Sequence, residues 1–219
     1  MRVTRILAVA TAVSLSVGVT LAFAGGWAAT TIHPISRGAV AGTPLRVTFT
    51  IRQHGRTPVR IDDVALELIA PGGGKRRVQA VPLAETGRYA ATVTFPRVGT
   101  WRWQVIQGWF APQPLGTIDV AADRASARPP LDGRSLFARK GCATCHAGPE
   151  GEARIGGAPD LAGRFRGPGG FAYVRQSILK PAAVVAPGGG YAGAPSVMPK
   201  LEVSRAEAEA LARYIVGQR

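Results

Sequence analysis

Residues 141–148 read GCATCHAG, a stretch that holds both cysteines of this 219-residue chain and one of its three histidines. Two small residues separate Cys142 from Cys145, and His146 follows the second thiol directly. Closely spaced cysteines are typical of a disulfide, a redox pair, a metal site or a covalently attached prosthetic group. The spacing and the flanking sequence distinguish these interpretations.

The first three interpretations fit the surrounding sequence poorly. A disulfide between Cys142 and Cys145 would close a very small ring, which contributes little stability because it constrains little of the unfolded chain. A thioredoxin-like pair belongs in a βαβ context, whereas the flanking sequence here is rich in glycine. A structural zinc site needs four ligands, and the other histidines, His33 and His54, lie far upstream.

The remaining interpretation is that Cys-x-x-Cys-His is the attachment site of a c-type haem. Thiols at this spacing add to the vinyl groups on one edge of the porphyrin, and the next residue then places its imidazole under the iron. We therefore expect one covalent haem c, with Cys142 and Cys145 as its tethers and His146 as its proximal iron ligand.

Met198 is the candidate for the second axial position, because it is the only methionine after Met1. A methionine opposite a histidine favours the reduced iron and raises the reduction potential. Downstream, Ser204 and Glu207 have the spacing of a capping box, which predicts the start of a C-terminal helix. The alternatives are an open sixth position that binds small gases, or ligation by Lys180, Lys200, His33 or His54.

The N-terminus indicates export. Arg2 and Arg5 precede an uncharged apolar run, 6–24, which ends in a small-x-small pattern. We expect residues 1–24 to be a signal peptide or, since about 20 apolar residues suffice to span a bilayer, a retained membrane anchor. Positive charge before the run keeps that end inside. The rest of the chain would then lie in the periplasm or on the outer face of the bacterial cytoplasmic membrane.

Upstream of the cysteine motif, the hydrophobic pattern has a period of two. In 45–52, Leu45, Val47, Phe49 and Ile51 alternate with polar residues, as in a half-buried strand. The same pattern or a glycine turn marks further strands within 62–74, 87–95, 100–106 and 114–121. Short strands without a helical stripe predict a β-sandwich over residues 30–120.

Residues 131–219 resemble a class I mono-haem cytochrome c. The resemblance rests on DGRSLFARKGCATCH (132–146), on GGAPDLAGRF (156–165), on FAYVRQSILKP (171–181) and on GGGYAGAPSVMP (188–199). It implies that Gly133 and Phe137 meet Tyr214 where the first and last helices cross. It also implies that the carbonyl of Pro159 accepts a hydrogen bond from His146, and that Met198 is the distal ligand.

The pattern around Gly87, Tyr89, Phe95, Gly99 and Trp101 resembles bacterial immunoglobulin-like periplasmic modules, and it concerns the fold alone. The expected architecture therefore has two domains: an N-terminal all-β immunoglobulin-like sandwich and a C-terminal all-α class I cytochrome c fold. The segment 121–130, which contains paired prolines, is the expected linker and an extended tether. We expect Trp101 and Trp103 in the core, while Trp109 is either core or an exposed contact.

These resemblances imply an electron-transfer protein rather than an enzyme, since no clustered acid, base or nucleophile appears. We expect a carrier, or a subunit of a respiratory or periplasmic redox complex, without a small-molecule substrate. A haem-based gas sensor with a labile sixth ligand remains an alternative. A copper-handling or assembly factor would need the sandwich to bind metal, and His33 and His54 are its only histidines.

Charge suggests the kind of partner. The chain has 27 Lys and Arg against 13 Asp and Glu, a net charge of +14, which favours an anionic surface. We expect a redox protein with an acidic docking face rather than a nucleic acid. One interpretation places the docking surface on a basic stretch, and the other treats that stretch as merely solvated; its residues are Arg124, Arg128, Arg134, Arg139 and Lys140.

Overall fold

The structure is a computed structural model that describes residues 26–147, 158–183 and 198–217. The expected export segment, 1–24, lies outside these residues. The strands are β1 (Ala28–Ile32), β2 (Ala39–Val40), β3 (Leu45–Gln53), β4 (Thr57–Pro58), β5 (Val64–Ile69), β6 (Lys75–Gln79), β7 (Val81–Pro82), β8 (Arg88–Val93), β9 (Gly99–Gln107) and β10 (Phe110–Ala121). The helices are α1 (Gly133–Arg139), the short 3-10 helix η1 (Cys142–Thr144), α2 (Gly170–Leu179) and α3 (Arg205–Val216).

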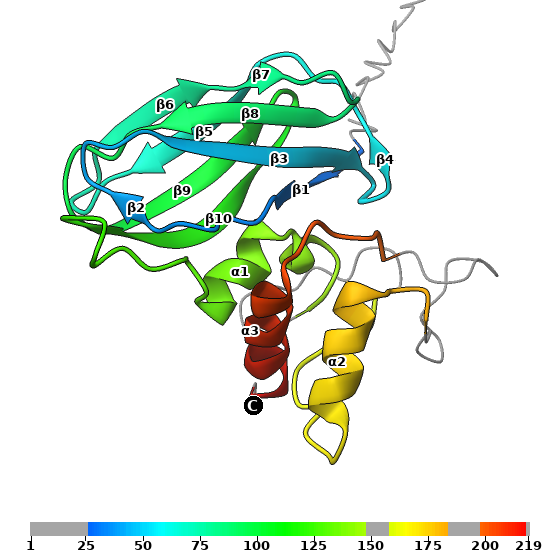
Figure 1. The fold of residues 1–219 in the computed structure, drawn as a ribbon. Coiled ribbons are helices and arrows are strands. Elements are labelled where there is room, and N and C mark those ends of the chain that lie inside the picture. Colours follow the sequence, from blue (N-terminus) through cyan, green and yellow to red (C-terminus); the bar gives the residue numbers. More distant parts are fainter. Residues whose placement is uncertain (1–25, 148–157, 184–197, 218–219) are drawn as a thin grey trace, which may run out of the picture.

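The strands form two sheets that face each other across one hydrophobic core (Figure 1). One sheet has the order β1-β3-β8-β7, with β4 also paired to β3, and the other has the order β2-β10-β9-β5-β6. All pairs are antiparallel except β2 with β10. The N-terminal region is therefore β-rich, as predicted, and its two sheets form a sandwich.

Alternation along the strands fills this core. Val47, Phe49 and Ile51 of β3 are buried between the sheets, as the period of two predicts. Trp101 and Trp103 are also buried, and Trp109 is 68% exposed at the turn between β9 and β10. The interpretation of Trp109 as an exposed side chain is the one that the structure supports.

The helices enclose a second core below the sandwich (Figure 1). A Cβ added to Gly133 of α1 would overlap the Cβ of Tyr214 on α3, and the rings of Phe137 and Tyr214 lie 5.8 Å apart. The close crossing of α1 and α3 therefore depends on glycine. The predicted capping box is present, because the Ser204 hydroxyl accepts from the Glu207 amide and the Glu207 carboxylate accepts from the Ser204 amide.

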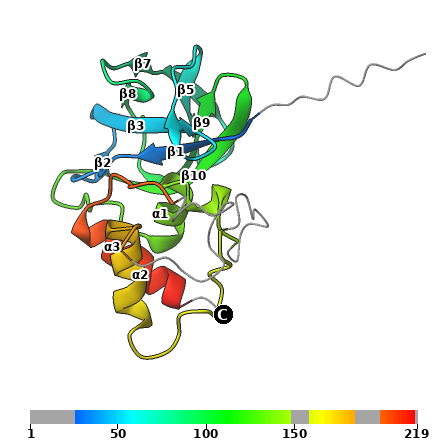
Figure 2. The same cartoon turned by 90° about the vertical axis from the view of Figure 1, so that its right-hand side faces the viewer.

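The two cores lie against each other, with α1 packed on β10 and β1 (Figures 1 and 2). A Cβ added to Gly116 of β10 would stand 2.6 Å from the Ser135 Cα of α1, and the Thr117 amide donates to the Ser135 hydroxyl at 3.1 Å. The segment between β10 and α1 is also held, since the Arg124 guanidinium donates to the Gly38 carbonyl at 3.2 Å. The helical part is thus docked on the sandwich.

None of the helices in the described ranges combines the length and the apolar character needed to cross a membrane.

Candidate functional site

The end of α1 delivers the cysteine motif. The helix ends at Arg139, with Lys140 as its C-cap, and Gly141 then turns the chain with a φ of 77°, in the left-handed region that glycine enters without steric cost. In the turn that follows, the amides of Cys145 and His146 both donate to the Cys142 carbonyl, at 3.1 and 2.9 Å. Residues three apart are eclipsed in a 3-10 turn, so the two thiols project from one side of it.

Both thiols are free of a disulfide and partly buried. Burial raises the pKa of the Cys142 thiol to about 12, and the neighbouring Cys145 adds to the shift. Burial also raises the pKa of the Cys145 thiol, against a hydrogen bond from Thr144. At neutral pH both sulfurs are therefore protonated thiols, the form that two thioether bonds would replace.

The imidazole of His146 is held in one orientation. Its Nδ1 lies 2.9 Å from the carbonyl oxygen of Pro159. A carbonyl can only accept, so Nδ1 carries the proton and Nε2 keeps its lone pair. Burial lowers the pKa of His146, against the hydrogen bond to Pro159, which favours the neutral ring. This is the tautomer that binds a metal through Nε2, with the partner of the other ring nitrogen fixing the ring.

Met198 lies at the edge of the helical core, partly buried, and packs against the same apolar cluster as Cys142. Met198 and Cys142 therefore border the same apolar region. Lys180 and Lys200 are exposed at the surface. Met198 as the distal ligand stays a prediction, and residues 184–197, which precede it, lie outside the described residues.

The sandwich also reaches this site, through residues that the sequence did not point to. A Cβ added to Gly55, in the turn between β3 and β4, would lie 3.0 Å from Cη2 of Trp27 and 3.7 Å from Sγ of Cys145. Gly55 is buried although it lies in a turn. No signal in the sequence could link Trp27 and Gly55 to a thiol so far downstream, because the contact depends on how the two cores dock.

Residues 131–218 match the family model described as Cytochrome c. This segment is a cytochrome c domain. Such a domain implies covalently bound haem c and electron transfer, and the residues present fit that group: two unpaired thiols on one side of a turn, a neutral imidazole with a fixed tautomer, and a thioether at the edge of the same core. A search of curated proteins found no match to the chain.

The solved structures with some likeness to this chain include the crystal structure of the Lin-41 filamin domain and the ZirS C-terminal domain. The first is 17% identical, with a TM-score of 0.36, and the match covers 43% of this chain and 93% of the filamin domain. The second is 12% identical, with a TM-score of 0.31, and the match covers 55% and 86% of the two chains.

Two residues of the expected basic docking surface are buried, so that part of the prediction is wrong. Arg139 and Lys140 are each about 1% exposed. The Lys140 ammonium donates to the carbonyls of Ile32 and Glu202 at 2.7 and 3.1 Å, and pairs with the Glu207 carboxylate at 2.9 Å. Lys140 therefore joins the end of α1 to β1, to the segment before α3 and to α3 itself.

Arg139 is buried and cannot act as a surface cation. Its guanidinium donates to the carbonyl of Pro130. Burial lowers the pKa of Arg139 to about 10, against the carboxylates of Glu207 and Asp132. Arg124, Arg128 and Arg134 remain exposed, so only these three residues of the basic stretch can meet a partner.

The two upstream histidines lie apart from each other. His33 Nε2 is 2.8 Å from the Thr50 hydroxyl, whereas His54 is exposed and its ring lies edge-on to Trp27, with centroids 6.1 Å apart. Among the described residues, no group of three or more His, Cys, Asp or Glu side chains is placed to hold a metal ion.

Proposed function

We propose that the protein is an exported c-type cytochrome that carries single electrons through one covalent haem c with His146 and Met198 as axial ligands. The observation that carries the proposal is the turn at Cys142–Cys145, followed by an imidazole whose Nδ1 is held 2.9 Å from the Pro159 carbonyl. When bound, the haem supplies a one-electron iron couple whose potential the axial ligands and the surrounding burial set.

The residues of the cytochrome c domain have separate roles in this proposal. The two cysteines fix the porphyrin edge, and Pro159 keeps the His146 ring oriented. An apolar shell limits the solvent reorganisation that accompanies a change of charge on the iron; its buried or partly buried members are Leu136, Phe137, Leu161, Phe165, Ile178 and Leu211. With both axial positions filled by the protein, the site would transfer electrons and not bind substrate.

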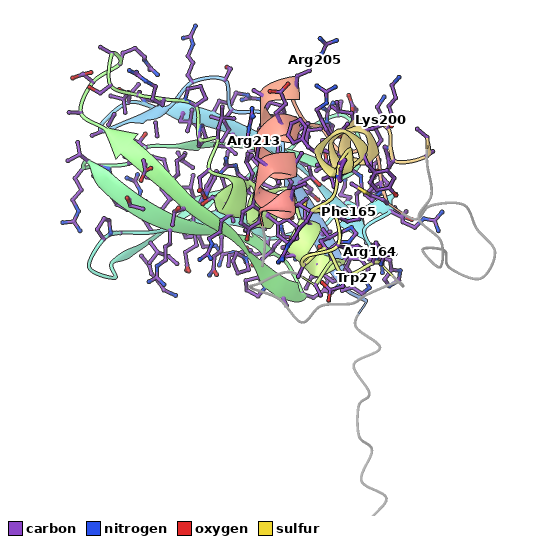
Figure 3. All side chains as sticks on the ribbon, turned by 90° about the horizontal axis from the view of Figure 1, so that it is seen from below. Trp27, Arg164, Phe165, Lys200, Arg205 and Arg213 are labelled. Atoms are coloured by element: carbon purple, nitrogen blue, oxygen red, sulfur yellow. The ribbon has the colours of Figure 1, made fainter. Side chains whose placement is uncertain are left out.

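The proposed partner is a redox protein with an acidic docking face, in a respiratory or periplasmic complex. Exposed basic side chains on the helical side of the molecule support it, including Arg164, Lys200, Arg205 and Arg213 (Figure 3). Complementary charge raises the encounter rate and is screened by salt. The rate of electron transfer to redox proteins copurified from the native membranes should therefore fall as ionic strength rises. A rate that does not change with ionic strength would contradict this docking mode.

The ligand set is tested by spectroscopy of protein produced with haem-maturation enzymes. We expect a reversible one-electron titration and a reduced spectrum that carbon monoxide does not change at neutral pH. Met198→Ala should open the sixth position and allow carbon monoxide to bind, and Lys200→Ala, two residues away, should behave as the native protein. Carbon monoxide binding to the native reduced protein would instead support the alternative of a gas sensor.

A further inference from the structure

We propose that the sandwich forms one wall of the haem site, with Trp27 and the turn at His54–Gly55 covering the porphyrin edge that is attached to Cys145. The inference rests on the proposed function, because it requires a haem bound through that sulfur. It goes beyond that function by giving the sandwich a direct part in the site, in addition to any role as a spacer or docking module.

The first observation is that a turn of the sandwich lies close to the tethering sulfur of Cys145. The position of a Cβ on Gly55 is 3.0 Å from the Trp27 indole and 3.7 Å from Sγ of Cys145. Both groups therefore lie close to the same point of the turn between β3 and β4. A thioether bond would join a porphyrin edge to that sulfur, so the edge would lie beside the turn and the indole. Figure 3 labels Trp27 in the view from the helical side.

The corner formed by Trp27, His54 and Gly55 is fixed by its own contacts. The His54 amide donates to the Trp27 carbonyl at 2.8 Å, and the Gly55 amide donates to the Arg52 carbonyl at 3.2 Å. His54 and Gly55 both have positive φ, 52° and 68°, a conformation that is uncommon for a residue other than glycine. The indole is thus presented by a well-defined turn.

The corner is also tied to the residues just before Cys142. The strand β1 starts directly after Trp27, and its Ile32 carbonyl accepts from the Lys140 ammonium at 2.7 Å. The Thr31 hydroxyl donates to the Lys140 carbonyl at 3.3 Å. A Cβ on Gly141 would lie 2.9 Å from the Thr30 carbonyl oxygen. Because β1 bonds and packs against the chain that carries the cysteines, the backbone that leads out of Trp27 is held next to this segment.

Covering one edge with an indole has two physical consequences. It removes water from that edge, and a less hydrated site disfavours the more highly charged oxidised iron, so the reduction potential rises. It also blocks small solutes from contacting the edge. Removal of the indole should therefore lower the potential and speed the reaction of the haem with a small reductant in solution.

The test compares holoproteins that carry Trp27→Ala, Trp27→Phe and Trp109→Ala. Trp109→Ala is the matched control, because Trp109 is an exposed tryptophan of the same sandwich. Intact mass and haem content are measured first. Reduction potential is then measured by spectroelectrochemical titration, and the rate of haem reduction is measured with ascorbate. We expect Trp27→Ala to lower the potential and to raise the rate several-fold, Trp27→Phe to change both less, and Trp109→Ala to match the native protein.

The outcomes separate the two proposals. If the native protein carries no haem, the proposed function fails. If all variants carry haem and Trp27→Ala has the native potential and rate, the proposed function is retained, and the proposal that the sandwich covers the haem edge is wrong. If Trp27→Ala does not mature, Trp27→Leu takes its place with the same expected directions, and a native potential and rate for that variant would likewise overturn the wall.

Discussion

Lys140 places a positive charge where water does not reach. Its side chain is 0% exposed and that of its partner Glu207 is 5% exposed, and burial lowers the pKa of Lys140 while Glu207 opposes the shift. An ammonium has three protons to donate, and they find the Glu207 carboxylate and the carbonyls of Ile32 and Glu202. The sequence showed a lysine next to the cysteine motif, and only the docking of β1 makes it a buried one.

Lys140→Met should therefore be strongly destabilising, because it leaves the Glu207 carboxylate buried without its partner. We expect a loss of about 3–5 kcal/mol in the free energy of unfolding, measured by guanidinium denaturation of the holoprotein. Adding Glu207→Gln, which removes the stranded charge, should recover part of this loss. Arg77→Met is the control, since Arg77 forms an exposed pair with Asp63 and should change stability by less than about 0.5 kcal/mol. A similar small effect for Lys140→Met would contradict the buried pair.

His33 makes stability depend on pH. Burial is the main cause that lowers its pKa; the neighbouring Glu202 raises it, and the cations of Arg88, Lys140 and Arg52 lower it. The hydroxyls of Thr48 and Thr50 face its two ring nitrogens. The folded state thus disfavours protonation of the His33 imidazole. In the unfolded chain this imidazole is protonated below the ordinary histidine pKa of about 6.5.

Stability from His33 is therefore full above that pH and is lost as the pH falls, by linkage. We expect the free energy of unfolding of the holoprotein to decrease between about pH 7 and pH 5, and His33→Gln to reduce this slope. Denaturation curves at several pH values measure it, and an unchanged slope in His33→Gln would show that another group titrates.

At the scale of the elements, periodicity and capping signals predicted features that depend on nearby residues alone, namely strand faces and helix starts. The alternation in 45–51 gave the buried face of β3, and Ser204 with Glu207 gave the start of α3. The same alternation also predicts a polar, solvated second face for β3. Thr50 and Arg52 are instead buried, because the helical part covers that end of the strand and the Arg52 guanidinium pairs with Glu202 at 2.9 Å.

The crossing of α1 and α3 yields a prediction for Gly133. Alanine is the better helix former, but its Cβ would overlap the Cβ of Tyr214 and stand 3.0 Å from the Ala210 carbonyl oxygen. Backbone and Cβ atoms cannot rotate away, so Gly133→Ala should destabilise the holoprotein by about 1–3 kcal/mol. Gly167→Ala is the control, since a Cβ there meets nothing within 4 Å. Equal stability of the two variants in thermal denaturation would contradict the close crossing.

At the scale of the whole molecule, the chain is a sandwich and a cytochrome c domain that share an interface of buried polar groups. The cysteine motif and the resemblance identified the second part from sequence. The interface was not predictable, because its members are separated by many residues and carry no common pattern: Thr31 meets Lys140, Gln113 meets Ala138, and Arg52 meets Glu202. Strand β1 is buried on both faces, because the sandwich core covers one face and the helical part covers the other.

This interface predicts cooperative unfolding of the two parts. Tryptophan fluorescence reports mainly on the sandwich, which holds all four tryptophans, and haem absorbance reports on the cytochrome c domain. In guanidinium titrations of the holoprotein, the two signals should change at the same denaturant concentration. Well-separated transitions in the native protein would contradict the shared interface.

Haem attachment through the two sulfurs is the claim on which the function depends, and the intact mass of the mature protein tests it most directly. The account predicts one mass, that of the polypeptide plus a single haem, which survives acid extraction of non-covalent pigment. Cys142→Ala with Cys145→Ala should leave only the mass of the bare chain. A native protein that shows the bare mass, after production with haem-maturation enzymes, would contradict the account.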